Sequence, residues 1–304
     1  MPRGKRAKPK GGEHSFGGDW TEKKLGVLAD YLRAYGKVLK YQPFHTTYID
    51  AFAGTGYRSL AGATSSDLLF PDLAADAPQG LLDGSARLAL KTSPRFNDYV
   101  FIERDAARCV ELENLRKAFP ELASDIRIDR GDANDRIRTL CKETDWRLRR
   151  AVLFLDPYGM QVEWQTITAV AATKAIDLWL LFPLGIGVNR LLTRSGDIPQ
   201  AWRAALDRLL GTSDWFDEFY QVQPDPQGSL FGSPRARVEK ATMETIGRYF
   251  NRRLKSVFAD VADPPGILRN SVQNPLYLFC FASGNKAGAR RAVPIANHLL
   301  ERIH

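Results

Sequence analysis

Cysteine and histidine are scarce in this chain of 304 residues. The three cysteines lie far apart and are odd in number, which argues against a disulfide framework. The four histidines show no metal-ligand spacing with the cysteines, so no zinc site is indicated. The residues concerned are Cys109, Cys141, Cys280, His14, His45, His298 and His304.

Long apolar runs are absent as well. The most apolar stretch, DLWLLFPLGIGV at residues 177–188, is too short to span a bilayer. No apolar run follows the first residues, as the core of a signal peptide would. We therefore expect a cytoplasmic protein with no membrane partner.

Positive charge is in excess, with a formal net charge of +8, and much of it is concentrated at the start of the chain. The opening MPRGKRAKPKGG has no large apolar residue after Met1 and cannot bury enough surface to order itself. Residues 1–13 are predicted to form a flexible basic arm, either a tether that attracts phosphates or a solvated tail. The rest of the chain is only mildly basic. The cations of the arm are Arg3, Lys5, Arg6, Lys8 and Lys10.

An amphipathic helix is predicted before the first strand, because apolar residues recur there at intervals of three and four. Lys23 and Lys24 lie in its first turn, where the helix dipole disfavours cations. They either contact an anion or, as we expect, belong to the solvated surface. The apolar positions are Leu25, Leu28, Leu32, Tyr35 and Leu39.

Apolar strands then alternate with helices, which is typical of a parallel sheet that is covered on both faces. We expect an α/β fold with an open, doubly wound, mostly parallel sheet, its core formed by residues 14–184 together with the first helix. From 185 to 258 the alternation stops, and this segment is predicted to be a helical insertion or lid that ends in a long helix from about Arg235 to Phe258. Residues 259–304 complete the sheet with a strand and a helix.

Acidic residues follow four of the predicted strands, at the sheet edge where α/β proteins bind ligands. They are Asp50, followed by Gly54 and Gly56, then Glu103, Asp132 and Asp156. AGTG lacks the third glycine of the dinucleotide fingerprint, and the chain has no GK[ST], so NAD and ATP are disfavoured. Carboxylates suit a cationic sulfonium compound with ribose hydroxyls, which describes S-adenosylmethionine. In the alternative interpretation, Asp132 caps a helix and Glu103 pairs with Arg104 or another neighbour.

Four stretches carry a resemblance to a known family: HSFGGDWTEKKLGVLADYLRAY, YIDAFAGTG, FIERD and FLDPYG. They are similar to sequences of the three-Cys-motif partner proteins, which resemble class I methyltransferases and are encoded beside a cysteine-motif protein similar to radical S-adenosylmethionine enzymes. The resemblance implies a Rossmann-like methyltransferase core with an antiparallel final strand. It also implies a three-Cys-motif protein, similar to radical S-adenosylmethionine enzymes, as partner. The predicted cofactor-binding residues are Asp50, Phe52, Gly54, Gly56, Glu103, Arg104, Asp132 and Ala133.

The DPYG motif at residues 156–159 resembles the Asp/Asn-Pro-Pro-aromatic motif of amino-directed nucleic-acid methyltransferases, and more closely the Asp-Pro-Phe-Gly of tRNA guanine N2-dimethyltransferases. Asp156 is predicted to accept a hydrogen bond from an exocyclic amine, Pro157 to set the backbone and Tyr158 to stack on a base. The alternative is a tight Asp-Pro turn, with Tyr158 packed on the inserted helices.

The leading hypothesis is thus a methyltransferase that acts on a base nitrogen in RNA or DNA. The alternatives are a non-catalytic subunit that delivers nucleic acid to the radical-enzyme partner, and a methyltransferase of small molecules or proteins. Candidate phosphate contacts, which could equally be solvated surface, are Arg147, Arg149, Arg150, Arg248, Arg252, Arg253, Lys255, Lys286, Arg290 and Arg291.

Overall fold

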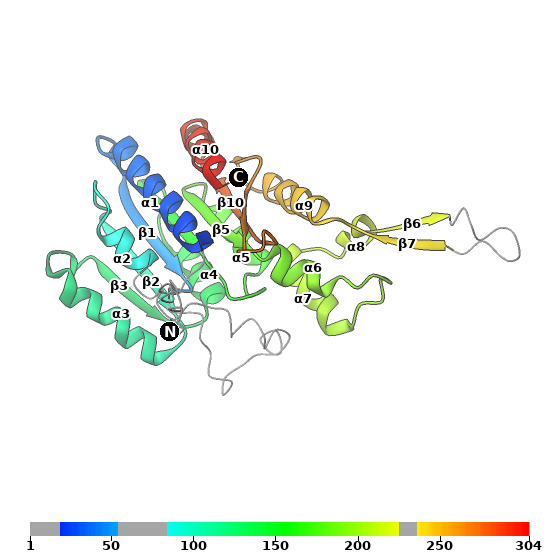
Figure 1. The fold of residues 1–304 in the computed structure, drawn as a ribbon. Coiled ribbons are helices and arrows are strands. Elements are labelled where there is room, and N and C mark those ends of the chain that lie inside the picture. Colours follow the sequence, from blue (N-terminus) through cyan, green and yellow to red (C-terminus); the bar gives the residue numbers. More distant parts are fainter. Residues whose placement is uncertain (1–18, 54–83, 225–235, 304) are drawn as a thin grey trace, which may run out of the picture.

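The computed structural model describes residues 19–53, 84–224 and 236–303. The predicted basic arm and both glycines of AGTG, Gly54 and Gly56, lie outside these residues. Figure 1 shows a central sheet with helices on both faces and two strands, β6 and β7, that extend away from it.

Strands and helices alternate through the first part of the chain, as the sequence predicts. In order they are α1 (Asp19–Leu39), β1 (His45–Ala51), α2 (Ser85–Leu90), β2 (Asp98–Glu103), α3 (Ala106–Ala118), a 3-10 turn (Pro120–Leu122), β3 (Ile126–Arg130), α4 (Ala133–Glu143), β4 (Arg149–Leu155), α5 (Trp164–Ala172) and β5 (Ile176–Phe182).

The second part begins with a π-helical turn, η5 (Leu184–Val188), directly after β5. It continues with α6 (Asn189–Leu191), α7 (Gln200–Leu210), α8 (Trp215–Phe219), β6 (Tyr220–Pro224), β7 (Ala236–Lys240), α9 (Met243–Lys255), β8 (Asp260–Val261), β9 (Gly266–Arg269), β10 (Pro275–Ser283), α10 (Lys286–Leu300) and a 3-10 turn (Glu301–Ile303).

The central sheet has the strand order β3-β2-β1-β4-β5-β10-β8, and β9 pairs with β10. Strands β1 to β5 are parallel to one another. Strand β10 runs antiparallel to β5, with Leu278 opposite Phe182 and Ser283 opposite Asp177. The predicted mostly parallel, doubly wound sheet is therefore confirmed, and so is the antiparallel strand near the end of the chain.

Apolar side chains cover both faces of the sheet, as expected for strands that are buried on two sides. Helices α1, α2, α3 and α10 contribute to one hydrophobic cluster with residues such as Tyr48, Phe154 and Trp179. Helices α4, α5, α7, α8 and α9 contribute to the other, with residues such as Leu153 and Phe182.

The segment 185–258 is not helical throughout. Residues 236–240, predicted as the start of a long helix, form β7, which pairs antiparallel with β6. The sequence ARVEK contains good helix formers, so local propensity favours a helix, but pairing with β6 satisfies the backbone in an extended form instead. Helix α9 begins only at Met243, where the Thr242 hydroxyl accepts a hydrogen bond from the Thr245 amide at 3.2 Å.

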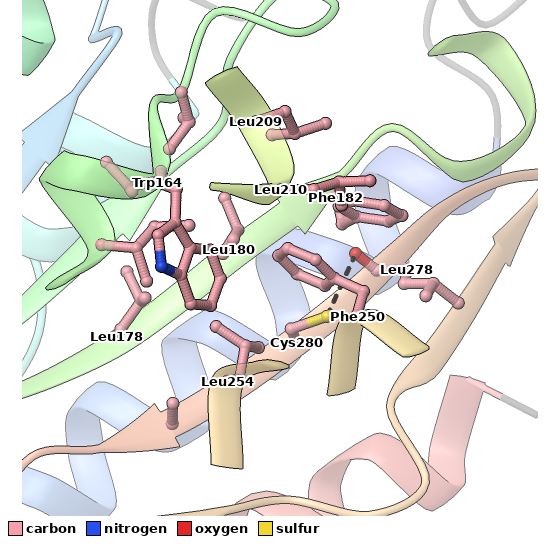
Figure 2. Packing of buried hydrophobic residues seen from close by; sticks show 14 of the residues in the cluster. Trp164, Leu178, Leu180, Phe182, Leu209, Leu210, Phe250, Leu254, Leu278 and Cys280 are labelled. Carbon is pink, nitrogen blue, oxygen red and sulfur yellow. Dashed lines mark hydrogen bonds between the residues drawn. The ribbon is translucent and has the colours of Figure 1, made fainter. Parts of the chain in front are cut away.

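The helices of this segment pack into the hydrophobic core of the sheet. Phe250 of α9 stacks on Phe182 of β5, with ring centroids 3.9 Å apart, and meets the Trp164 ring edge-on at 6.3 Å. Figure 2 shows Phe250 between Phe182, Leu278 and Cys280, with Leu254 of the same helix nearby. Helix α9 is thus a structural layer of the core.

Candidate active site

The order of the parallel strands reverses between β1 and β4, so ligands are expected at the carboxyl ends of these strands. Ala51 of β1 is level with Ile102 of β2 and Leu155 of β4. Glu103 and Asp156 follow these two residues directly, on either side of β1. Neighbouring strands are about 4.8 Å apart, so both lie roughly one strand spacing from the end of β1.

Alternation along the strands places the three carboxylates on one face of the sheet. Asp50, Glu103 and Asp156 come two residues after Tyr48, Phe101 and Phe154, which all belong to the cluster beneath α1. The structure therefore brings these predicted site residues together at one edge and on one face.

Asp50 is the most buried of the three, with 1% of its surface exposed. The Tyr48 hydroxyl donates a hydrogen bond to Asp50 Oδ2 at 3.2 Å, and the Ser85 hydroxyl at the start of α2 donates another. Burial raises the pKa of Asp50, the two hydrogen bonds and Lys24 lower it, and nearby Asp156 raises it; together these effects bring the pKa to about 7. A cationic ligand group beside this carboxylate would favour its charged form.

Phe52 follows β1 in a left-handed backbone conformation, with φ at 72°. A bulky side chain rarely adopts this conformation, and such outliers cluster at functional sites. The turn also returns the backbone to the sheet, because the Ala53 amide donates to the Ile102 carbonyl at 3.0 Å. The predicted site residue Phe52 thus lies at a strained turn between Glu103 and Asp156.

Glu103 is buried at the end of β2, where its Oε1 accepts a hydrogen bond from the Asp105 amide at 2.7 Å. This bond orients the carboxylate, whose Oε2 can also act as an acceptor. Arg104 is exposed, and Glu103 accepts from the amide of Asp105, so the pairing with a neighbour that the sequence suggested involves Asp105.

Asp132 caps α4. Its Oδ1 accepts from the amides of Asn134 at 2.9 Å and Asp135 at 3.3 Å, as in the alternative interpretation of this residue. The side chain is exposed, so capping does not prevent its other oxygen from meeting a ligand. The next residue, Ala133, points into the hydrophobic core and can serve a ligand only through its backbone.

Asp156 begins the DPYG turn with 30% of its side chain exposed. Pro157 is buried, Tyr158 is half-buried, and Gly159 has a φ of 62°, which glycine adopts without strain. Asp156 Oδ2 accepts a hydrogen bond from Lys24 Nζ of helix α1. The turn thus combines a tight change of direction with a carboxylate that reaches solvent.

Lys24 is one site residue that the sequence interpretation missed, because it was assigned to the solvated surface. Its side chain is 2% exposed, so the expectation of a solvated surface is wrong here, although Lys23 beside it is exposed. Position 24 precedes the buried Leu28, Tyr31 and Tyr35 at helical intervals, and this spacing was the available signal. The anion that compensates the lysine is Asp156.

Asn134 is a second missed residue, and it connects α4 to the loop that follows DPYG. Its Nδ2 donates to the Gln161 carbonyl at 2.9 Å. Its Oδ1 accepts from the Glu163 amide at 3.0 Å and the Thr166 hydroxyl at 2.8 Å. These bonds fix the loop between the DPYG turn and α5. The motif GDAND alone does not indicate that Asn134 has partners in this loop.

Three of the predicted phosphate contacts, all on α9, have partners within the protein. Arg253 is held inside the helical segment, where it donates to the Leu210 carbonyl and lies 4.4 Å from the Trp164 ring centroid, which is a structural role. Arg252 pairs with Glu218, and Arg248 pairs with Glu244 at 3.5 Å.

Two other predicted contacts, Lys286 and Arg290, are exposed in the first turns of α10. Helix α10 follows Ser283, which is level with Asp177 near the amino end of β5. The fold therefore places these two cations toward the sheet edge opposite Asp156.

The described part of the chain contains no cluster of three or more His, Cys, Asp or Glu side chains suited to a metal ion. Among its helices, none has the length and apolar character needed to cross a membrane.

Comparison with known proteins gives likenesses of fold only. No protein-family model matches the chain, and no curated protein matches it. Among solved structures, a candidate methyltransferase of Thermobifida fusca is 13% identical, with a TM-score of 0.40, and the match covers 88% of this chain and 82% of that one. An S-adenosylmethionine-dependent methyltransferase of Clostridium acetobutylicum is 12% identical, with a TM-score of 0.37 and coverages of 86% and 92%. The magnesium protoporphyrin IX methyltransferase of Synechocystis, solved with S-adenosylmethionine bound, is 13% identical, with a TM-score of 0.29 and coverages of 73% and 80%.

Proposed function

We propose that this protein is an S-adenosylmethionine-dependent methyltransferase that acts on an amino nitrogen of a base in RNA or DNA. The observation that carries the proposal is the placement of Asp50, Glu103 and Asp156 on one face at the carboxyl ends of β1, β2 and β4 respectively. Acidic side chains around a topological switch point oppose a diphosphate, and the unpaired negative charge of a buried carboxylate such as Asp50 suits a cationic ligand.

The residues present fit the proposed cofactor, which supplies an electrophilic methyl group when bound. The buried Asp50 carboxylate suits the ammonium group of its amino-acid part, because that cation would compensate a charge that burial otherwise disfavours. Glu103 Oε2 suits the ribose hydroxyls as an acceptor, and the bond between Oε1 and the Asp105 amide holds the carboxylate in position.

Asp156 and Tyr158 support the acceptor half of the proposal. The lone pair of an exocyclic amine on a base is delocalised, so the amine must be held in line with the methyl group by hydrogen-bond acceptors. Asp156 is partly exposed beside the proposed cofactor position, and the half-buried Tyr158 offers a ring for stacking.

Asp156→Ala is expected to lower kcat for methyl transfer by about 100-fold or more, because one preorganised hydrogen-bond partner of the reacting amine is lost. Cofactor affinity, measured by calorimetry, should stay within about threefold of the wild-type value. The matched control is Asp145→Ala, which removes an exposed carboxylate outside the site. Full activity of Asp156→Ala would overturn the catalytic assignment.

The broader test is incubation of the protein with methyl-labelled cofactor and separate pools of RNA, DNA and protein. Label in a nucleic-acid pool, removed by Asp156→Ala, is the expected result. Label in the protein pool alone would reject the nucleic-acid substrate.

A second candidate function is a non-catalytic subunit that delivers nucleic acid to a three-Cys-motif radical-enzyme partner. The observation that favours it is the ion pair between buried Lys24 and partly exposed Asp156, which links α1 to the DPYG turn and gives Asp156 a structural role. Co-purification with the protein encoded beside it, together with no transfer to any pool, would support this function.

A further inference from the structure

Lys24 places a positive charge inside the acceptor half of the site. Its Nζ donates to Asp156 Oδ2, and it lies 5.1 Å from the centroid of the Trp20 ring and 5.9 Å from that of Phe154. Only 2% of its side chain is exposed, so water contributes little to the solvation of its charge. The ammonium group is therefore held by the Asp156 carboxylate and by two aromatic faces.

This pairing changes what the Asp156 carboxylate can attract. An isolated carboxylate in a partly buried site favours a cationic acceptor such as an alkylammonium group. With Lys24 beside it, the positive and negative charges of the Lys24–Asp156 pair cancel, but an oxygen of Asp156 can still accept a hydrogen bond. A neutral amine satisfies such a site, whereas a second cation would be repelled by Lys24.

Further aromatic side chains lie near the Lys24–Asp156 pair. The rings of Trp20 in α1 and Tyr277 in β10 lie 5.4 Å apart between centroids, at an interplanar angle of 33°. Burial raises the pKa of the Tyr277 hydroxyl, and the nearby groups Asp156 and Tyr158 raise it further, which places all three side chains in one neighbourhood. Trp20, Tyr158 and Tyr277 are each half-buried, so solvent reaches part of each residue.

We propose that Lys24, Trp20 and Tyr277 form the acceptor-binding side of this site and select a neutral, planar aromatic amine over an alkylammonium group. This inference rests on the proposed function for the position of the acceptor. It adds three binding residues to the proposed function. Lys24 cancels the attraction of Asp156 for cations, so the site selects acceptors by their charge, which we call the charge criterion. The two rings provide flat apolar surface for a base.

Equilibrium binding of small probes tests the charge criterion without any methyl transfer. The probes are cytidine, aniline and benzylammonium at pH 8, where aniline is a neutral aromatic amine and benzylammonium a cation of similar size. Each is titrated into the full-length protein by ligand-observed NMR, with and without saturating S-adenosylhomocysteine. The wild-type protein is expected to bind cytidine and aniline in preference to benzylammonium.

Lys24→Met should raise the affinity for benzylammonium relative to aniline by about tenfold or more, because Asp156 then carries an uncompensated charge. The matched control is Lys23→Met, which removes an exposed lysine from the same helical turn and should leave the ratio unchanged. Equal ratios in the two variants would overturn the charge criterion.

The double variant Lys24→Met/Asp156→Asn removes both charges and keeps the test valid if the single variant folds poorly. It should fold like the wild type and prefer the neutral probes again, and a preference for benzylammonium in this variant would contradict the proposal.

Trp20→Leu and Tyr277→Leu should each weaken cytidine and aniline binding by about fivefold or more, and unchanged binding in both would remove the rings from the acceptor site. Failure of S-adenosylhomocysteine to bind the wild type would count against the proposed function, while the probe ratios would still decide the acceptor proposal.

Discussion

Asp50→Asn is expected to stabilise the protein at pH 8 while weakening S-adenosylmethionine binding by about 100-fold. The carboxyl group is buried, and burial raises its pKa in the folded state to about 7, from an ordinary value of 3.8. Asparagine can keep the hydrogen bonds with Tyr48 and Ser85 and has no charge to bury. The expected loss of binding reflects the missing partner for the cofactor's ammonium group.

The sign of the pH dependence follows from the raised pKa. Below pH 3.8 the group is protonated in both states, and its contribution to stability is fully present. Between pH 3.8 and about 7 the unfolded chain has released the proton that the folded protein retains, so stability falls as the pH rises. The loss is complete once the pH has passed about 7. The difference amounts to at most about 4 kcal/mol. Thermal unfolding between pH 4 and pH 8 should show a flatter profile for Asp50→Asn than for the wild type.

Asp177→Asn is the matched control for this prediction. Asp177 is also buried, and its pKa is raised to about 6, but it lies near the amino end of β5, where Tyr31 and Ser283 donate hydrogen bonds to it at 2.6 Å each. Its replacement should alter the pH profile of stability without changing cofactor affinity. Wild-type cofactor affinity in Asp50→Asn would remove Asp50 from the binding site.

Phe250→Ala is expected to lower the free energy of unfolding by about 3–5 kcal/mol, a typical cost of removing a large aromatic side chain from a core. Phe250 is fully buried, stacks on Phe182 of the central sheet and meets Trp164 edge-on. If α9 is a layer of this core, its loss of packing should destabilise the whole fold in one cooperative transition. Denaturant unfolding followed by circular dichroism and by tryptophan fluorescence gives the measurement.

The control for Phe250→Ala is Arg248→Ala, on the exposed face of the same helix. Its ion pair with Glu244 is solvated, so removal should change stability by less than about 0.5 kcal/mol. A small loss of stability in Phe250→Ala, with two separate transitions, would indicate that α9 belongs to an independently folding lid.

Much of the sheet could be predicted because buried parallel strands and their helices leave strong local patterns. Strand β4 and the apolar run of β5 are buried on both faces, and Asp50, Glu103 and Asp156 mark the ends of β1, β2 and β4. Strand β7 could not be predicted in the same way, since its residues favour a helix until β6 is placed beside them.

The candidate site shows the same division. Asp156 was identified from its place at a strand end, but Lys24 lies 132 residues away along the chain and was assigned to the surface. Arg253 was assigned to phosphate binding because it lies in a basic stretch, and only the packing of α9 shows that it contacts Trp164 and Leu210. Charge along a sequence does not say which face of a helix is covered.

The sequence by itself determined the alternating α/β architecture and the three strand ends where acidic residues gather, since both follow from local periodicity and from the rule that parallel strands end at a common edge. The tertiary structure alone decided which groups compensate those acids. It brought α1 across the sheet to place Lys24 on Asp156 and set Tyr277 beside Trp20. These contacts join segments far apart in the chain, and their energies depend on burial, which local sequence does not specify.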